Sequence, residues 1–143
     1  MKVFINPGHA PGIDSGAVNA NGTQEAEVAL KVGRLVSKYL ENVGIATELL
    51  QSNSLNGEDE DVANPSICRT ANNSGADLFI SIHCNAFNRQ ARGTECCIYG
   101  IGGESELLAG CIQQQIVKSL GTVDRGIKTR PKLTVLRCTS MPA

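Results

Sequence analysis

Residues 77–83 read Asp-Leu-Phe-Ile-Ser-Ile-His and form the most strand-like stretch of the chain. The run is nearly continuous in apolar character, which is typical of a strand buried on both faces of a parallel sheet. Residues 2–6, Lys-Val-Phe-Ile-Asn, are similar, and a segment rich in glycine and proline follows them and ends the strand. We therefore expect two buried strands, one ending at His83 and the other leading into a loop that holds His9.

Helical patterns separate the predicted strands. Residues 25–43 carry apolar side chains at helical spacing, have two acidic residues in the first turn and are followed by Gly44, which predicts an amphipathic helix. Further strands are predicted at residues 45–50, 93–99 and 134–137. A short helix is predicted with Asn64 as its N-cap and Pro65 as its first residue, and it should end near Gly75. Another helix is predicted at residues 104–120, followed by Gly121. Strand and helix alternate without a repeat or linker. This order predicts an α/β fold, a single layered domain over residues 1–143 with a mostly parallel twisted sheet and helices on both faces.

The composition excludes several functional classes. The 143 residues suit one domain. The chain has 13 Lys and Arg against 14 Asp and Glu, and its few aromatic residues are scattered, so no basic surface is left over for nucleic acid. No apolar run approaches the ~20 residues that span a bilayer, and the N-terminus lacks the pattern of a signal peptide. We predict no nucleic-acid partner, no membrane insertion and no signal peptide in this chain.

The six cysteines contain no Cys-x-x-Cys pair and lie in apolar stretches. This distribution favours buried reduced thiols over a disulfide framework or a thiolate zinc site. If the chain binds a catalytic metal, both of its histidines are therefore needed, with a carboxylate as the third ligand.

The carboxyl ends of parallel strands are where ligands gather in an α/β sheet. His9 and His83 are both predicted at that edge, and Glu25 opens the first predicted helix. Two imidazoles and one carboxylate are a ligand set of catalytic zinc, which keeps its fourth position for water. On spacing alone two interpretations remain open: a metal site, or histidines that only bond to neighbouring backbone.

Several ordered segments along the whole chain form a more specific pattern. They are Ile5-Asn6-Pro7-Gly8-His9, residues 14–18 (Asp-Ser-Gly-Ala-Val), Gly22-Thr23-Gln24-Glu25 with Leu30, Arg69 and Asn72 leading into residues 76–86 with Ser-Ile-His-x-Asn-Ala, Gly93-Thr94-Glu95, residues 125–128 (Arg-Gly-Ile-Lys), and residues 133–137 with Met141-Pro142-Ala143. In these segments the chain resembles the zinc-dependent N-acetylmuramoyl-L-alanine amidases of the type 3 family.

The resemblance implies roles for individual residues. His9, Glu25 and His83 would bind zinc, one ion per domain. The spacing to Leu30 selects Glu25 over Glu27, and residues two apart on a helix point about 200° apart. Asn85 and Arg125 would contact the substrate; their alternative roles are a turn residue at the strand end and a solvated loop charge.

The resemblance also implies an activity, the hydrolysis of the amide between N-acetylmuramic acid and L-alanine in peptidoglycan. An enzyme of this kind lyses or remodels cell walls as an autolysin or endolysin. It would act at the bacterial cell wall, extracellularly or in the periplasm, and a phage or prophage lysin made in the cytoplasm also fits a chain without a signal peptide.

The family pattern continues beyond the Met-Pro-Ala block, with a strand that ends in the catalytic glutamate and then a helix. This chain stops at Ala143, so the general base is expected past Ala143, and the predicted domain lacks that strand and helix. Glu95 is a weaker candidate for the base, and Asp14 is interpreted as a turn residue. The alternatives are a non-catalytic zinc-containing module that binds muropeptides, an inactive fragment, and another zinc hydrolase such as a carboxypeptidase.

Overall fold

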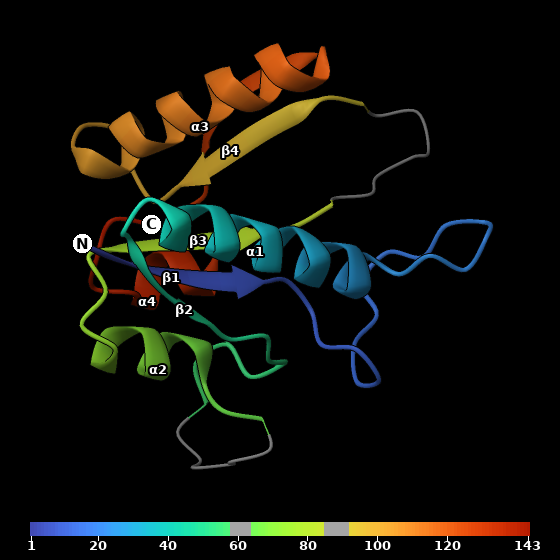
Figure 1. Ribbon diagram of the computed structural model, residues 1–143, viewed down its shortest axis with the longest axis horizontal. Helices are drawn as coiled ribbons and strands as arrows, with labels where there is room; N and C mark the ends of the chain where they lie inside the picture. The colour runs from blue at the N-terminus through green and yellow to red at the C-terminus, as the bar shows by residue number, and fades with distance from the viewer. Residues whose placement is uncertain (58–63, 85–91) are drawn as a thin grey trace. The chain divides into compact units, whose positions relative to one another are not determined.

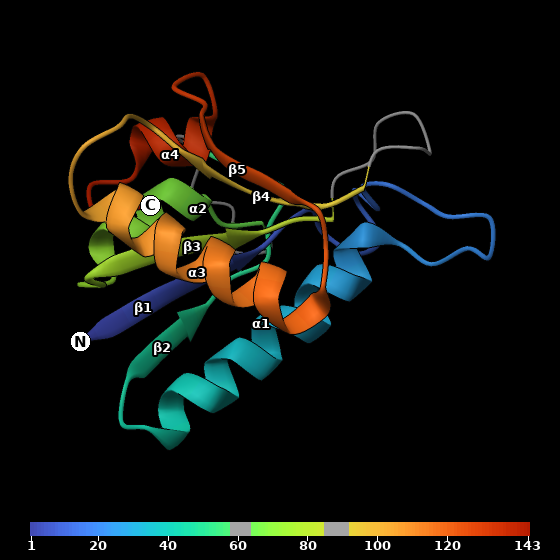
Figure 2. The same cartoon turned by 90° about the horizontal axis from the view of Figure 1, so that it is seen from above.

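The computed structural model describes residues 1–57, 64–84 and 92–143. The chain divides into two compact units, Met1–Asn85 with Cys138–Pro142, and Ala86–Arg137 with Ala143. Its elements, labelled in Figures 1 and 2, are β1 (Lys2–Pro7), α1 (Glu25–Asn42), β2 (Ala46–Leu49), α2 (Ile67–Asn73), β3 (Leu78–Ile82), β4 (Thr94–Ile98), α3 (Glu104–Leu120), β5 (Asp124–Thr129) and α4 (Thr134–Cys138). All paired strands are parallel, in the order β2-β1-β3 in the first unit and β4-β5 in the second. The α/β class with parallel strands is confirmed.

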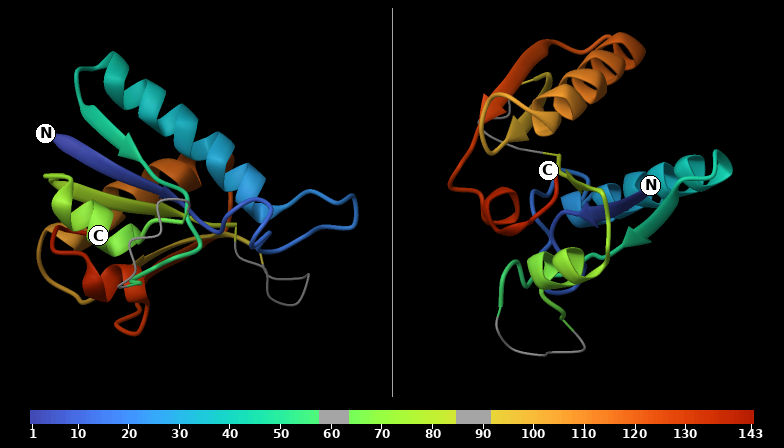
Figure 3. Two further views of the ribbon diagram at one scale, coloured as in Figure 1. Left: turned by 90° about the horizontal axis from the view of Figure 1, so that it is seen from below. Right: turned by 90° about the vertical axis from the view of Figure 1, so that its left-hand side faces the viewer.

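The first unit is built around β1, the central strand of its sheet. Phe4 and its register partner Phe79 are buried, and their rings stack with centroids 5.8 Å apart. Helices α1 and α2 lie against opposite faces of this sheet (Figures 1 and 3). Pro7 pairs with Ile82 at the carboxyl ends of β1 and β3, and Gly8 N extends the pairing by donating to Ile82 O over 2.8 Å. The residues that follow these two strands therefore lie side by side.

Helix α1 begins at the residue predicted and ends one residue earlier than predicted. Its buried residues after the first are small, Ala26, Ala29 and Gly33, whereas Leu35 and Tyr39 are exposed. Small residues let the helix lie close to β1, since a Cβ on Gly33 would come within 2.8 Å of the Pro7 ring. Within the described residues, no helix is long and apolar enough to cross a membrane.

The second unit consists mainly of α3 packed along the two parallel strands β4 and β5 (Figure 2). The buried side chain of Gln113 ties the helix to both strands, because its Nε2 donates to Thr94 O over 2.7 Å and to Asp124 Oδ1 over 2.6 Å. Helix α3 has the bounds predicted, and Gly121 ends it in the left-handed conformation. Strand β5 is not among the predicted elements.

The strand predicted at residues 134–137 is wrong. The structure forms a short helix there, α4. A run of four residues with few apolar positions is too short to show a period of 2 or of 3.6, so its local pattern does not separate strand from helix.

The predicted start of the second helix is also wrong. Helix α2 begins at Ile67, and its N-cap is Ser66, whose side chain accepts from Arg69 N. Asn64 makes a different contact: its Oδ1 accepts from Ser52 Oγ over 2.7 Å and from Asn53 N over 2.9 Å. The Asn-Pro signal therefore marks the loop before the helix.

The six cysteines all lie within the described ranges and form no disulfide. Cys68 is buried, and burial, followed by the neighbouring Cys138, raises its pKa to about 11. Cys84 and Cys111 are exposed, so the prediction of buried thiols is wrong for these two residues.

Candidate metal centre

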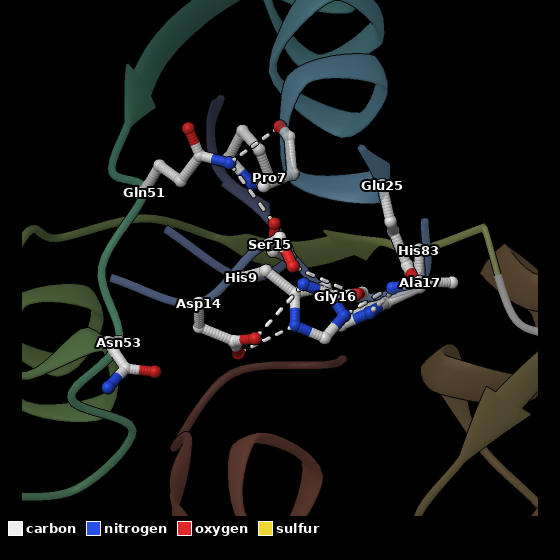
Figure 4. Close-up of polar contacts among 12 residues, drawn as sticks. Pro7, His9, Asp14, Ser15, Gly16, Ala17, Glu25, Gln51, Asn53 and His83 are labelled. Atoms are coloured by element: carbon white, nitrogen blue, oxygen red, sulfur yellow. Dashed lines mark hydrogen bonds and ion pairs between the residues drawn. The ribbon is translucent and has the colours of Figure 1, made fainter. Parts of the chain in front are cut away.

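His9, Glu25 and His83 converge in the first unit from three segments of the chain. His9 follows β1, Glu25 is the first residue of α1, and His83 directly follows β3. One nitrogen or oxygen of each residue lies within 4.8 Å of those of the other two. Glu25 Oε1 is 3.3 Å from His9 Nε2 and 3.1 Å from His83 Nδ1, and the two rings meet edge to face with centroids 4.9 Å apart (Figure 4). The structure thus brings together the three residues singled out in the sequence.

The Glu25 carboxylate is buried and bonded through both oxygens. Oε2 accepts from Ala17 N over 3.1 Å, and Oε1 accepts from Cys84 N over 2.8 Å. Burial alone would raise the pKa of Glu25, but these two backbone donors and the charge of His9 outweigh it and lower the pKa. Glu25 is therefore held as an anion, whereas Glu27 is exposed.

The loop after β1 holds His9 in an unusual backbone conformation, with φ at 62°. A left-handed backbone at a residue other than glycine costs on the order of 1 kcal/mol and persists only where the surroundings impose it. Here Ala10 and Asp14 exchange two backbone hydrogen bonds, of 3.0 and 2.8 Å. Gln51 Nε2 also donates to Gly8 O over 3.1 Å and to Ala26 O over 2.9 Å, which ties the loop to α1. No local sequence signal points to this role of Gln51.

Asp14 lies in the turn that was expected, and it also contacts His9. Its Oδ1 accepts from Gly16 N over 3.0 Å, and its Oδ2 is 2.7 Å from His9 Nδ1. The hydrogen bond from His9, then that from Gly16, lowers the pKa of Asp14. Burial alone would lower the pKa of His9, but the hydrogen bond to Asp14 and the charges of Glu25 and Asp14 raise it. Sequence reasoning missed this contact, although a loop rich in glycine and proline between the two residues is a signal that the chain turns back.

Two of the three pairs of donor atoms are spaced like the ligands of a zinc ion. Two ligands about 2.1 Å from a tetrahedral zinc are about 3.4 Å apart, close to the 3.1 and 3.3 Å that separate Glu25 Oε1 from the two imidazole nitrogens. Two imidazoles and a carboxylate also match the preference of zinc for nitrogen and oxygen ligands. The side chain of His83 is 40% exposed, so the cluster is open to solvent on one side. The three residues could hold a metal ion that keeps a free coordination position.

The other candidate residues lie elsewhere in the chain. Arg125 and Glu95 belong to the second unit, where Arg125 Nε donates to Glu95 Oε2 over 3.0 Å. The structure therefore joins these two residues in an ion pair between β5 and β4. Asn85 lies outside the described residues.

The chain is similar to known proteins over almost its whole length. The family model for N-acetylmuramoyl-L-alanine amidase matches residues 3–143. The chain is 37% identical to the N-acetylmuramoyl-L-alanine amidase CwlM of Bacillus licheniformis, over 100% of this chain and 54% of that protein. It is 36% identical to the endolysin of Bacillus phage SPP1, over 99% of this chain and 51% of that protein. The chain thus spans about half the length of these curated relatives.

A solved structure agrees with these matches. The N-acetylmuramoyl-L-alanine amidase from Clostridium difficile 630 superposes with a TM-score of 0.79 and 30% identity, covering 99% of this chain and 75% of that one. Sequence and fold thus agree over almost the whole length of the chain. The chain belongs to the N-acetylmuramoyl-L-alanine amidase family.

Proposed function

We propose that this chain is the zinc-binding part of an enzyme that hydrolyses the amide between N-acetylmuramic acid and L-alanine in peptidoglycan. The observation that carries the proposal is the convergence of His9, Glu25 and His83 in a member of an amidase family. The proposal includes one zinc ion per domain, with these three residues as ligands, and one amidase domain over residues 1–143.

The ligand set suits amide hydrolysis. Zinc held by three protein ligands polarises a carbonyl at its open position and lowers the pKa of a bound water to about 7. His9 and His83 would each offer a ring nitrogen, and Glu25 would supply a single negative charge, which its bonds to Ala17 N and Cys84 N stabilise. With a divalent ion bound, this set of ligands would carry a net positive charge, which would favour negative charge on a substrate carbonyl oxygen.

Substrate binding and proton transfer need further groups. We propose Asn85 and Arg125 as substrate contacts, and a glutamate past Ala143 as the base that takes the proton of the attacking water. Glu95 remains a second candidate for this role. Its carboxylate is bonded to Arg125, so its use as a base would require this ion pair to open.

The relatives also suggest where the enzyme works. One is named an endolysin and another an N-acetylmuramoyl-L-alanine amidase. We infer that this chain acts at the bacterial cell wall, extracellularly or in the periplasm, and a phage or prophage lysin made in the cytoplasm fits as well.

Metal content tests the ligand assignment. We expect one zinc per wild-type chain by elemental analysis, and loss of zinc in His83→Ala and in Glu25→Gln. Glu27→Gln is the matched control, because Glu27 lies in the same helical turn but is exposed, and it should keep its zinc. Retention of zinc in both His83→Ala and Glu25→Gln would contradict the assignment.

Product analysis tests the reaction. An amidase releases dye from labelled cell walls and frees the amino group of L-alanine without forming new reducing sugar ends. Both the 143-residue chain and one extended by the strand and helix of the family pattern should be measured, since the base is expected past Ala143. Zinc and muropeptide binding without hydrolysis in both chains would favour the non-catalytic module. Cleavage of a peptide with a free carboxylate, but not of muramyl peptides, would favour a carboxypeptidase.

A further inference from the structure

The Asp14 carboxylate joins two parts of the loop beside the metal centre. Its Oδ2 lies 2.7 Å from His9 Nδ1, while its Oδ1 accepts from Gly16 N. In Figure 4, Asp14 stands on one side of the His9 ring and Glu25 and His83 stand on the other. The ring of His9 therefore bridges a carboxylate outside the cluster and the ligand atoms inside it.

This contact determines which ring nitrogen can bind a metal. A carboxylate only accepts hydrogen bonds, and both ring nitrogens of His9 face one. Nδ1 lies 2.7 Å from Asp14 Oδ2, whereas Nε2 lies 3.3 Å from Glu25 Oε1, so in the neutral ring the shorter contact favours the hydrogen on Nδ1. His9 Nε2 then keeps its lone pair, and this is the nitrogen 3.3 Å from Glu25 Oε1. In the opposite tautomer Nε2 would carry the hydrogen and donate it to Glu25, which would leave His9 unable to bind a metal through that atom.

The turn that contains Asp14 also fixes the position of the ring. A Cβ on Gly16 would come within 2.5 Å of His9 Cδ2, so the backbone at Gly16 lies directly against the ring. The turn is itself attached to the start of α1, because Ala26 N donates to Ser15 O over 3.1 Å and Ala17 N donates to Glu25 Oε2. One carboxylate thus links the orientation of His9 to the helix that supplies Glu25.

We propose that Asp14 is a positioning residue that fixes the tautomer and the orientation of His9 and thereby sets the affinity of the site for zinc. This inference rests on the proposed zinc site. Partners of this kind, which orient a metal ligand without touching the metal, typically contribute roughly 10–100-fold to metal affinity.

Zinc affinity is the first test. Competition with a chelator of known affinity, at one fixed pH, should show binding roughly 10–100-fold weaker for Asp14→Ala than for the wild type. Asp14→Asn keeps one acceptor oxygen, so its zinc affinity should lie between those of Asp14→Ala and the wild type. Asp124→Ala is the matched control: Asp124 Oδ1 accepts from Gly126 N over 2.8 Å in a similar turn that contains no histidine, so this variant should bind zinc like the wild type. Wild-type affinity in a folded Asp14→Ala overturns the proposal, and circular dichroism confirms that each variant is folded.

The tautomer itself is the second test, and it needs no metal. Long-range ¹H–¹⁵N spectra of the metal-free chain at pH 9, well above the ordinary imidazole pKa of about 6.5, should show the hydrogen of His9 on Nδ1 in the wild type and a shift toward Nε2 in Asp14→Ala. A hydrogen on Nε2 in the wild type overturns the proposal. If the wild-type spectrum is as expected but the wild type binds no zinc, the zinc assignment fails while the contact between Asp14 and His9 stands.

Discussion

The chain contains two Asp-x-Gly turns with similar local geometry and different surroundings. In residues 14–16 and 124–126 the aspartate Oδ1 accepts from the glycine N, over 3.0 and 2.8 Å, and the glycines have φ of 63° and 72°. The first turn presents its other carboxylate oxygen to His9, whereas the second binds the buried amide of Gln113. The motif determines the turn, but the residue that the fold places against it determines the role.

Replacing the glycine of each turn by alanine should give the largest difference between the two turns, in both stability and zinc affinity. A Cβ on Gly16 meets the His9 ring, whereas a Cβ on Gly126 has nothing within 4 Å. Gly126→Ala should cost about 1–2 kcal/mol of stability for its left-handed backbone alone. Gly16→Ala should cost more and also weaken zinc binding at least about tenfold, because it displaces the ring of His9, a proposed ligand. Urea unfolding and chelator competition measure the two effects, and equal losses of stability with unchanged zinc affinity would contradict the role given to Gly16.

Loss of the Gln113 side chain, whose amide donates to the second turn, should lower the stability of the fold. Gln113→Ala removes the donor that Thr94 O and Asp124 Oδ1 share and leaves both acceptors without it. A typical hydrogen bond contributes about 0.5–1.5 kcal/mol net, and the half-buried Thr94 O loses its donor, so urea unfolding should show a loss of about this size. Zinc affinity should not change, since Gln113 belongs to the second unit and the three candidate ligands belong to the first. A change in zinc affinity would show that the two turns are not independent.

The smallest effect is a difference in pH dependence, measured on the metal-free chain. The pKa of Asp14 is lowered by the hydrogen bonds of His9 and Gly16, and the pKa of Asp124 is lowered by those of Gln113 and Gly126. Each carboxylate therefore stabilises the fold above about pH 3.8, and this contribution is lost as the pH falls. The pKa of His9 is raised, so its contribution is present below about pH 6.5 and is lost as the pH rises through the folded-state pKa.

Unfolding free energies between pH 3 and 9 test this difference. The stability lost in Asp14→Asn should be largest between about pH 4 and 6.5 and should shrink at higher pH. The loss in Asp124→Asn should stay level above about pH 4, because no histidine titrates against that turn. Two profiles of the same shape would contradict the specific pairing of Asp14 with His9.

The parts of the fold that could be predicted carry their signals locally. Strands β1 and β3 are short apolar runs, and α3 has both a helical period and a terminal Gly121, so all three were predicted to within a residue or two at each end. Strand β5 was missed because its sequence, Asp-Arg-Gly-Ile-Lys-Thr, has no strand pattern, and its pairing with β4 makes it a strand. The helix at 134–138 was mistaken for a strand because the run is too short to show whether its apolar residues follow a strand or a helix period.

The candidate site also has a part that could be predicted from the sequence and a part that could not. His9, Glu25 and His83 could be chosen from their places at strand ends and at a helix start, together with the family resemblance. The contacts that hold them could not be predicted, because they involve backbone groups such as Cys84 N and distant side chains such as Gln51. These partners become visible only when the loops have been placed by the sheet.

The pairing of Pro7 with Ile82 has a consequence for folding. His9 and His83 are far apart in the sequence and meet only when β1 and β3 are paired, so an unfolded chain would have to close a long loop to form the site. A metal ion would therefore bind the native unit in preference to the unfolded chain, and at a hundredfold excess over its dissociation constant it would add about 2.7 kcal/mol to stability. Resistance of this unit to heat and to proteases would then rise and fall with the zinc supply of its surroundings.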